Sequence, residues 1–315
     1  YNRFKTVNGL KDFTDMMVEL AANASLVPHL KVVFLDEAQD LTPLQWQVAK
    51  ILSDNSDRMF VAGDDDQGIY RWAGADIDQF INLSSGSEVL EQSYRIYDPQ
   101  NFDFNGEGSW LVMAQANYML DGIAAEMKST GQFFERYNQP SLGQRVRDAI
   151  SAWNHIQQED GHEISLRDAQ NLYRHISSGE GKLQRGAKKM LDGANDQDTF
   201  SLSVLRKHFG LQVPDTTWDV ALDRIRDEDR AYITALLNRG VNIFQKPTIK
   251  LSTIHGSKGG EADNVLLYLD LSSKALQEME RNPDDAHRVL YVGITRTKNN
   301  LVLKMPEDQQ RGWAV

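Results

Sequence analysis

Two adjacent carboxylates, Asp36 and Glu37, follow directly on the apolar run at residues 32–35. The run predicts a buried strand, and a carboxylate pair at the end of such a strand suits Mg²⁺–nucleotide chemistry. One carboxylate can hold the metal or its water, while the next orients and deprotonates an attacking water. An isolated Asp-Glu pair is usually a solvated turn, so the surrounding elements decide between the two interpretations.

A second group of polar side chains follows the apolar run at residues 59–62. The segment GDDDQGIYRWAGAD contains Gln67, Tyr70 and Trp72. A glutamine amide can hydrogen-bond a γ-phosphate or its attacking water. An exposed Trp beside Arg71 can stack on an unpaired base, an interaction worth about 1–3 kcal/mol. Burial of Tyr70 and Trp72 in the core is the structural alternative.

These side chains need strands that end at one edge of a sheet. A helical pattern, LTPLQWQVAKIL, separates the two apolar runs, so strand, helix and strand succeed one another with acids at the strands' carboxyl ends. Ligands of α/β proteins bind at that edge. Apolar runs return at residues 249–255, 263–271 and 300–305, whereas 136–246 shows helical spacing and few β-branched runs. The predicted fold class is α/β with parallel sheets and a helical insertion.

Composition and charge bound the class of protein. The 315 residues are 41% hydrophobic and 25% charged, include no cysteine and contain no run near the ~18 apolar residues of a membrane span. We therefore expect a soluble, cytoplasmic protein with no membrane partner. The net charge of −11 disfavours coating of nucleic acid through bulk charge. The basic stretch 171–190 is either a local nucleic-acid track or a solvated helix face.

Five segments in one order make the sequence recognisable. They are DEAQD, GDDDQGIYRWAGAD, VLEQSYR, LSTIHGSKGGEADNVLL and RVLYVGITRTKNNLVL. Together they resemble the successive motifs of the UvrD/Rep/PcrA family of superfamily 1 DNA helicases. The resemblance implies two RecA-like parallel-sheet domains, the first truncated at its amino terminus and the second carrying a helical accessory insertion. The implied boundaries are 1–95 for the first domain, 96–135 with 247–315 for the second, and 136–246 for the insertion.

The resemblance assigns an ATP and Mg²⁺ site. It implies that Asp36 is the Mg²⁺ ligand and Glu37 the general base that activates water. Arg95 and Arg296 would reach the γ-phosphate as arginine fingers, a role that fits the fixed, always charged guanidinium. Glu261 matches the acid that meets the nucleotide sugar. A decayed carboxylate site and structural ion pairs at the two arginines are the alternatives.

The resemblance also assigns a DNA site. Gln67 would sense the γ-phosphate and couple it to DNA, while Trp72 and Tyr70 would stack on bases of the bound strand. His255 lies where the family contacts single-stranded DNA, although a histidine in such a turn is often only a hydrogen-bonded support. The implied partners are single-stranded and junction DNA and a loader, repair or replication protein. The implied protein is a bacterial or phage-encoded monomer.

One part of this chemistry is missing from the sequence. A phosphate loop follows GxxxxGK[ST], whose backbone N–H groups cradle phosphates and whose Lys and hydroxyl meet the phosphates and Mg²⁺. No stretch supplies it, because Gly181-Lys182 is followed by Leu183 and GSKGG belongs to the late motif. In the family this loop lies well upstream of DEAQD. The resemblance therefore predicts that the amino-terminal part of the first RecA-like domain is absent from this chain.

The sequence is consistent with three functions. The first is an ATP-dependent DNA helicase or translocase, expected to travel 3′ to 5′, of which this chain is a portion that is inactive alone. The second is a non-catalytic DNA-binding or partner-binding product that retains the helicase scaffold. The third is a metal nuclease centred on Asp64, Asp65 and Asp66.

Overall fold

The computed structural model describes residues 1–83, 88–89, 108–158, 162–179, 181–306 and 308–313. They belong to two compact units: unit 1 is Tyr1–Gln100, Met113–Ala116 and Thr253–Val315, and unit 2 is Asn101–Val112 and Asn117–Ser252. The domain boundaries expected from the sequence stay a prediction. Among the described residues, no helix is long and apolar enough to cross a membrane.

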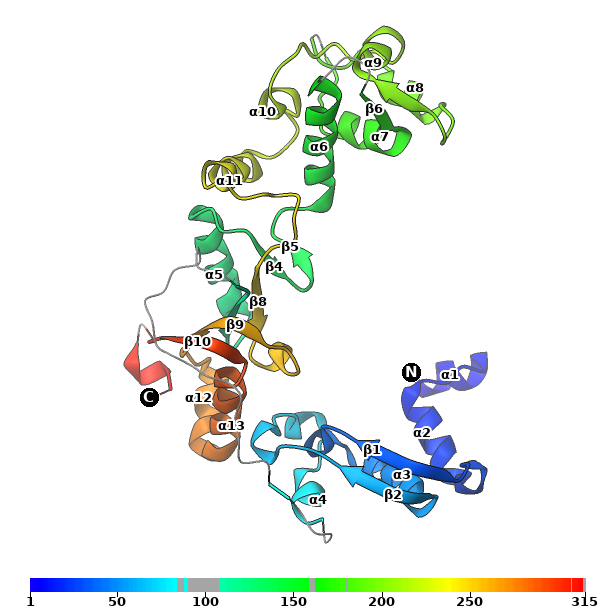
Figure 1. The fold of residues 1–315 in the computed structure, drawn as a ribbon, viewed down its shortest axis with the longest axis vertical. Helices are drawn as coiled ribbons and strands as arrows, with labels where there is room; N and C mark the ends of the chain where they lie inside the picture. The colour runs from blue at the N-terminus through cyan, green and yellow to red at the C-terminus, as the bar shows by residue number, and fades with distance from the viewer. Residues whose placement is uncertain (84–87, 90–107, 159–161, 180, 307, 314–315) are drawn as a thin grey trace. The chain divides into compact units, whose positions relative to one another are not determined.

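The amino-terminal part of unit 1 is a parallel strand–helix–strand arrangement preceded by two helices. Its elements are α1 (Asn2–Asn8), α2 (Phe13–Ala22), β1 (Leu30–Leu35), α3 (Pro43–Asp54), β2 (Ser56–Val61) and α4 (Ile77–Ile81). Strands β1 and β2 pair in parallel, and α3 packs against both (Figure 1). The strand–helix–strand order expected around the two acidic segments is confirmed.

Helix α3 begins where its sequence allows a complete cap. The Thr42 side chain accepts a hydrogen bond from the Gln45 N–H, the Gln45 side chain accepts one from the Thr42 N–H, and Pro43 occupies the first turn. These groups satisfy backbone donors that would otherwise be unpaired and fix the direction in which the chain leaves β1. Trp46 and Ala49 are the buried residues of α3, and they pack against side chains of both strands. The helix thereby holds the two strand ends in register.

The expectation of a buried strand at residues 32–35 was wrong, because Val32 and Phe34 are exposed and Val33 and Leu35 are only half-buried. Phe34 is 78% exposed and stacks on Phe60 of β2 with ring centroids 5.3 Å apart. Side chains alternate between the two faces of a strand, and the α3 side takes up Leu35, Met59 and Val61. The aromatic pair therefore occupies the opposite face.

The carboxyl-terminal part of unit 1 contains a second parallel strand pair. Its elements are β9 (Ala262–Tyr268), α12 (Ser273–Arg281), α13 (Pro283–Ile294) and β10 (Thr297–Lys304). Strand β9 pairs in parallel with β10, with Val265 opposite Leu301, and the apolar run that predicted β9 is buried. The carbonyl of Ala114, the last residue of β3 (Trp110–Ala114), accepts a hydrogen bond from Ile254 N–H at 3.2 Å. The two late runs of this unit are therefore strands, as expected.

Unit 2 combines α-helices with two small groups of strands. Its elements are α5 (Asn117–Ser129), β4 (Phe134–Arg136), β5 (Gln139–Pro140), α6 (Gln144–Gln158), β6 (Glu163–Ser165), α7 (Leu166–Arg174), α8 (Ala187–Asp192), β7 (Thr199–Ser201), α9 (Leu202–His208), α10 (Trp218–Ala221), α11 (Asp227–Asn238) and, but for its last residue, β8 (Ile249–Thr253). Strand β4 pairs in parallel with β8 and antiparallel with β5, while β6 pairs antiparallel with β7. The helical texture expected for 136–246 is present, with the short β6–β7 ladder added to it.

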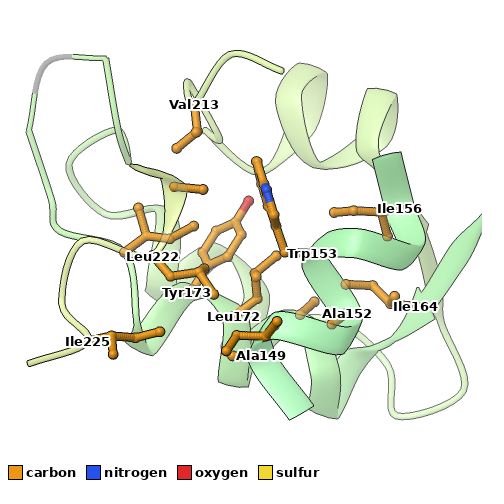
Figure 2. Packing of buried hydrophobic residues seen from close by; sticks show 14 of the residues in the cluster. Ala149, Ala152, Trp153, Ile156, Ile164, Leu172, Tyr173, Val213, Leu222 and Ile225 are labelled. Carbon is orange, nitrogen blue, oxygen red and sulfur yellow. The ribbon is translucent and has the colours of Figure 1, made fainter. Parts of the chain in front are cut away.

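The core of unit 2 surrounds two aromatic side chains. On α6, Ala149, Ala152, Trp153 and Ile156 recur at helical spacing and are all buried, and Tyr173 of α7 lies in the same cluster (Figure 2). The indole Nε1 of Trp153 donates to the Thr216 carbonyl at 2.9 Å, and the Tyr173 hydroxyl donates to the Phe209 carbonyl at 3.1 Å. Both polar tips are therefore satisfied inside an apolar core.

Candidate functional site

The turn after β1 sets the two predicted carboxylates side by side on the surface. Asp36 Oδ1 accepts a hydrogen bond from the Glu37 N–H at 2.9 Å, and both residues are exposed. Glu37 has φ 52° and ψ 39°, the left-handed region, which costs a non-glycine residue roughly 1–2 kcal/mol. The Ala38 N–H donates to the Ala62 carbonyl at 3.0 Å, which ties this turn to the end of β2. Such backbone strain often marks a functional position.

A buried amide holds Glu37 in place. Gln39 is fully buried, its Nε2 donates to Glu37 Oε2 at 2.6 Å, and its Oε1 accepts from the Asp64 N–H at 3.1 Å. Gln39 thus joins the segment after β1 to the segment after β2. A carboxylate oriented by an immobile amide is well placed to accept a proton from water.

Gln67 and Arg296 are brought into direct contact. Arg296 is only 3% exposed, and its Nη2 donates to Gln67 Oε1 at 2.7 Å. The Nε2 of Gln67 donates to Asp64 Oδ2 at 2.7 Å, while Arg296 also donates to the backbone carbonyls of Val292 and Gly260. Two residues assigned to γ-phosphate sensing therefore share one hydrogen bond.

Lys258 is a site residue to which the sequence reasoning assigned no role. Its side chain is 6% exposed, and its Nζ lies 2.7 Å from the Asp40 carboxylate, 2.5 Å from the Gln67 carbonyl and 3.9 Å from Glu37 Oε2. Burial raises the pKa of Asp40, Lys258 opposes that rise, and the nearby Glu37 adds to it. The lysine supplies the positive charge that two neighbouring carboxylates need. A lysine in a glycine-rich turn directly after a strand was the available sequence signal.

Three rings form the predicted DNA-contacting group. Tyr70, Trp72 and His255 have ring centroids 6.3–6.4 Å apart, and the Tyr70 hydroxyl donates to the His255 carbonyl at 3.2 Å. Trp72 is 76% exposed, so the alternative that it is a core anchor was wrong. Burial, followed by the nearby Lys258, lowers the pKa of His255 below its ordinary value of 6.5. The imidazole is therefore neutral at physiological pH and suits stacking or hydrogen bonding more than charge pairing.

Glu261 and Arg95 are the two remaining predicted site residues. Glu261 forms an ion pair with Lys298 at 2.5 Å, and its assignment to the nucleotide sugar stays a prediction. Arg95 lies outside the described residues. Within the described part of the chain, no group of three or more His, Asp or Glu side chains is placed to hold a metal ion.

The donors present fit part of a Mg²⁺–nucleotide site. Mg²⁺ binds through one or two carboxylates together with waters and phosphate oxygens, and the exposed Asp36 offers such a carboxylate beside Glu37. The buried, positively charged side chains of Lys258 and Arg296 contact Asp40, which follows β1, and Gln67, which follows β2. The backbone cradle for phosphates is the part that this sequence does not supply.

Comparisons with known proteins agree with the motif order. Residues 1–87 match the UvrD/REP helicase N-terminal domain, and residues 230–307 match the UvrD-like helicase C-terminal domain. A "Probable DNA helicase" of Mycoplasma pneumoniae is 25% identical over 96% of this chain and 50% of its own length. "DNA helicase II" of Escherichia coli is 34% identical over 28% of this chain and 14% of its own length. "ATP-dependent DNA helicase PcrA" of Staphylococcus aureus is 30% identical over 30% of this chain and 15% of its own length. The chain thus spans half the length of the first relative and smaller shares of the others.

Proposed function

The chain belongs to the UvrD/Rep/PcrA family of superfamily 1 DNA helicases, and we propose that it supplies the water-activating and DNA-gripping residues of an ATP-driven DNA translocase. The observation that carries this proposal is one hydrogen-bonded network inside unit 1. It runs from Glu37 through Gln39 and Asp64 to Gln67, and from Gln67 to Arg296 and Lys258. The DNA-facing rings join it, because Lys258 Nζ lies 5.2 Å from the Tyr70 ring centroid.

We propose a role for each of these residues, and the network supports the roles of Glu37, Gln67 and Arg296. Asp36 would hold Mg²⁺, and Glu37, oriented by Gln39, would accept a proton from the attacking water. Arg296 and Gln67 form one unit, so a movement of either is transmitted to the other. Mg²⁺–ATP, when bound there, would supply the phosphoryl group that is transferred to water. Arg95 is proposed as the second arginine at that group and Glu261 as the contact to its sugar.

The proposed nucleic-acid partner is single-stranded DNA, with a junction as the substrate to be opened. The exposed ring of Trp72 and the neutral imidazole of His255 can stack on or hydrogen-bond unpaired bases without sequence preference. Travel from 3′ to 5′, a monomeric state and a loader or repair partner are proposed by family resemblance. Phosphate-loop residues from a further segment would complete the ATP site.

The test is DNA-stimulated ATP hydrolysis by the full-length protein. Glu37→Gln should lower turnover by about 10²-fold to 10⁴-fold, because it removes the general base but keeps the side-chain shape. The same variant should bind single-stranded DNA as the unchanged protein does. Unchanged turnover in both Glu37→Gln and Arg296→Ala would refute the assignment.

A non-catalytic DNA-binding product is the second candidate function. Such a product would keep the exposed Trp72 ring as its DNA contact without hydrolysing ATP. The two candidates differ in one measurement, since only the first predicts ATP hydrolysis by the full-length protein. DNA binding without any hydrolysis would select the second.

A further inference from the structure

The turn between β4 and β5 holds an aromatic residue in an unfavourable backbone conformation. Tyr137 has φ 53° and Asn138 has φ 58°, so both residues of this two-residue turn are left-handed. Two-residue hairpins of this type prefer Asn and Gly at these positions because a Cβ is disfavoured there. Asn138 conforms to that preference, whereas Tyr137 does not. The fold therefore keeps a bulky ring where a glycine would be less strained.

Three contacts hold that ring in one orientation. The Tyr137 hydroxyl donates to Asn117 Oδ1 at 2.8 Å, and Arg136 Nη2 donates to the same hydroxyl at 3.3 Å. The guanidinium of Arg136 lies 4.9 Å from the ring centroid. Arg136 is itself fixed, since it donates to Asp121 Oδ1 at 2.6 Å and to the Asn117 carbonyl at 3.0 Å. The ring is thus tied down at its hydroxyl and by the guanidinium packed against it.

The rigid ring is nevertheless displayed to solvent. Tyr137 is 67% exposed, although an aromatic ring that is held in one orientation is usually stabilised by burial. It directly follows the last residue of β4, at the carboxyl end of the parallel β4–β8 pair. That end of a parallel sheet is where α/β proteins bind ligands. A fixed, exposed, flat ring suits stacking with a flat guest such as a nucleobase.

We infer that Tyr137 is a stacking platform for an unpaired nucleobase, in addition to the rings of unit 1. The guest is a base of single-stranded DNA, so the inference rests on the proposed function and adds a contact to it. Arg136 would fix the ring from the guanidinium side, and the base would stack on its solvent-facing part. Stacking on an aromatic ring tolerates every base, because each base has a π face.

The experiment uses anisotropy of a labelled oligo(dT) strand bound to the whole 315-residue chain. A strand of the same length with abasic sugars serves as the second probe. Tyr137→Gly should weaken oligo(dT) binding by about five-fold to a hundred-fold and leave abasic binding nearly unchanged. Tyr137→Phe should keep most of the affinity, because the ring and its Arg136 contact remain.

Asn138→Gly is the matched control. It relaxes the other left-handed position of the same turn without removing a ring, so oligo(dT) binding should not change. The melting temperature of Tyr137→Gly should stay near that of the unchanged chain, because relief of the left-handed strain offsets the loss of the ring's hydrogen bonds. An affinity loss together with retained stability is the expected signature of the platform.

Different results would contradict the stacking role of Tyr137 and the proposed DNA binding. Equal losses on both strands, or no loss on oligo(dT), would overturn the stacking role of Tyr137. If Trp72→Ala weakens oligo(dT) binding in the same assay while Tyr137→Gly does not, this inference alone fails. If the unchanged chain binds neither strand, the DNA-binding part of the proposed function fails with it.

Discussion

Gln67 accepts a hydrogen bond from Arg296 at 2.7 Å, although the two residues lie 229 positions apart. Because Arg296 is almost completely buried, this bond is shielded from water, and a change of either residue weakens it. Gln67 belongs to the segment after β2, and Arg296 to the turn between α13 and β10. The bond therefore connects the two α/β parts of unit 1.

The first prediction concerns the energetic coupling of this pair. Arg296→Ala should destabilise the chain by about 1–3 kcal/mol, because the buried carbonyls of Val292 and Gly260 lose a donor. Gln67→Ala should cost less, and the double variant should show a coupling energy of about 0.5–3 kcal/mol. Urea unfolding of the four proteins measures these differences. Strict additivity would show that the bond contributes nothing.

The second prediction concerns Lys258. Lys258→Met leaves Asp40 and Glu37 without their neutralising charge and should destabilise the chain by about 1–3 kcal/mol, below the range of a fully buried pair because Asp40 is partly exposed. Asp40→Asn in the same chain should recover part of that loss, since the unpaired charge is then gone. Denaturant midpoints of the single and double variants test this recovery. A double variant less stable than Lys258→Met would contradict it.

The sequence predicted the parts of unit 1 that depend on local patterns. Apolar runs ending in acids predicted β1 and β2 correctly, because such runs must be strands or buried helices and the 12-residue helix α3 between them has its own capping signals. The order of the motifs assigned Gln67 and Arg296 to one predicted site. Their side chains are hydrogen-bonded to each other, and their roles at a nucleotide stay a prediction.

Features that depend on distant contacts could not be predicted. Lys258 meets Asp40 across 218 positions, and no local pattern encodes that distance. The exposure of Phe34 depends on what covers the sheet, which the strand's own sequence does not specify. Tyr137 escaped notice because Tyr-Asn is a weak turn signal beside Asn-Gly or Gly-Gly.

The third prediction separates DNA contact from stability at Trp72. Because this side chain is 76% exposed, Trp72→Ala should leave the free energy of unfolding nearly unchanged. The same change should cost about 1–3 kcal/mol of single-strand binding. Phe13, which is 84% exposed, is the matched control, since Phe13→Ala removes an exposed aromatic ring at a position with no assigned role. Similar affinity losses in both variants would remove the argument for Trp72.

The fourth prediction follows from the lowered pKa of His255. The unfolded chain protonates this imidazole near its ordinary value of 6.5, whereas the folded chain does so only at lower pH. Between those two values the unfolded state binds more protons, so this group's contribution to stability is complete above about pH 6.5 and is lost as pH falls. His255→Gln should therefore flatten the fall in unfolding free energy between about pH 7 and about pH 5. Urea midpoints at both ends of that range, compared with the unchanged chain, give the difference. An unchanged slope would contradict the shift.

The last prediction concerns the basic stretch 171–190 of unit 2, proposed as a contact to the duplex arm of a junction. The structure separates its cations, because Lys182 donates to the Val220 carbonyl at 2.7 Å and lies 4.0 Å from Asp223, whereas Arg185 and Lys189 are exposed. Only the exposed cations can release counterions from phosphates, and each such contact makes affinity fall more steeply with salt.

Arg185→Glu with Lys189→Glu should therefore weaken binding to a duplex junction and lower its salt dependence, while single-strand binding changes little. Lys182→Met is the matched control, since it removes a cation of the same stretch that is already hydrogen-bonded to the Val220 carbonyl within unit 2. It should lower stability through the loss of the Val220 and Asp223 contacts and should leave the salt slope of junction binding unchanged. Equal weakening of single-strand and junction binding by the double variant would indicate a general charge effect and would rule out a duplex contact.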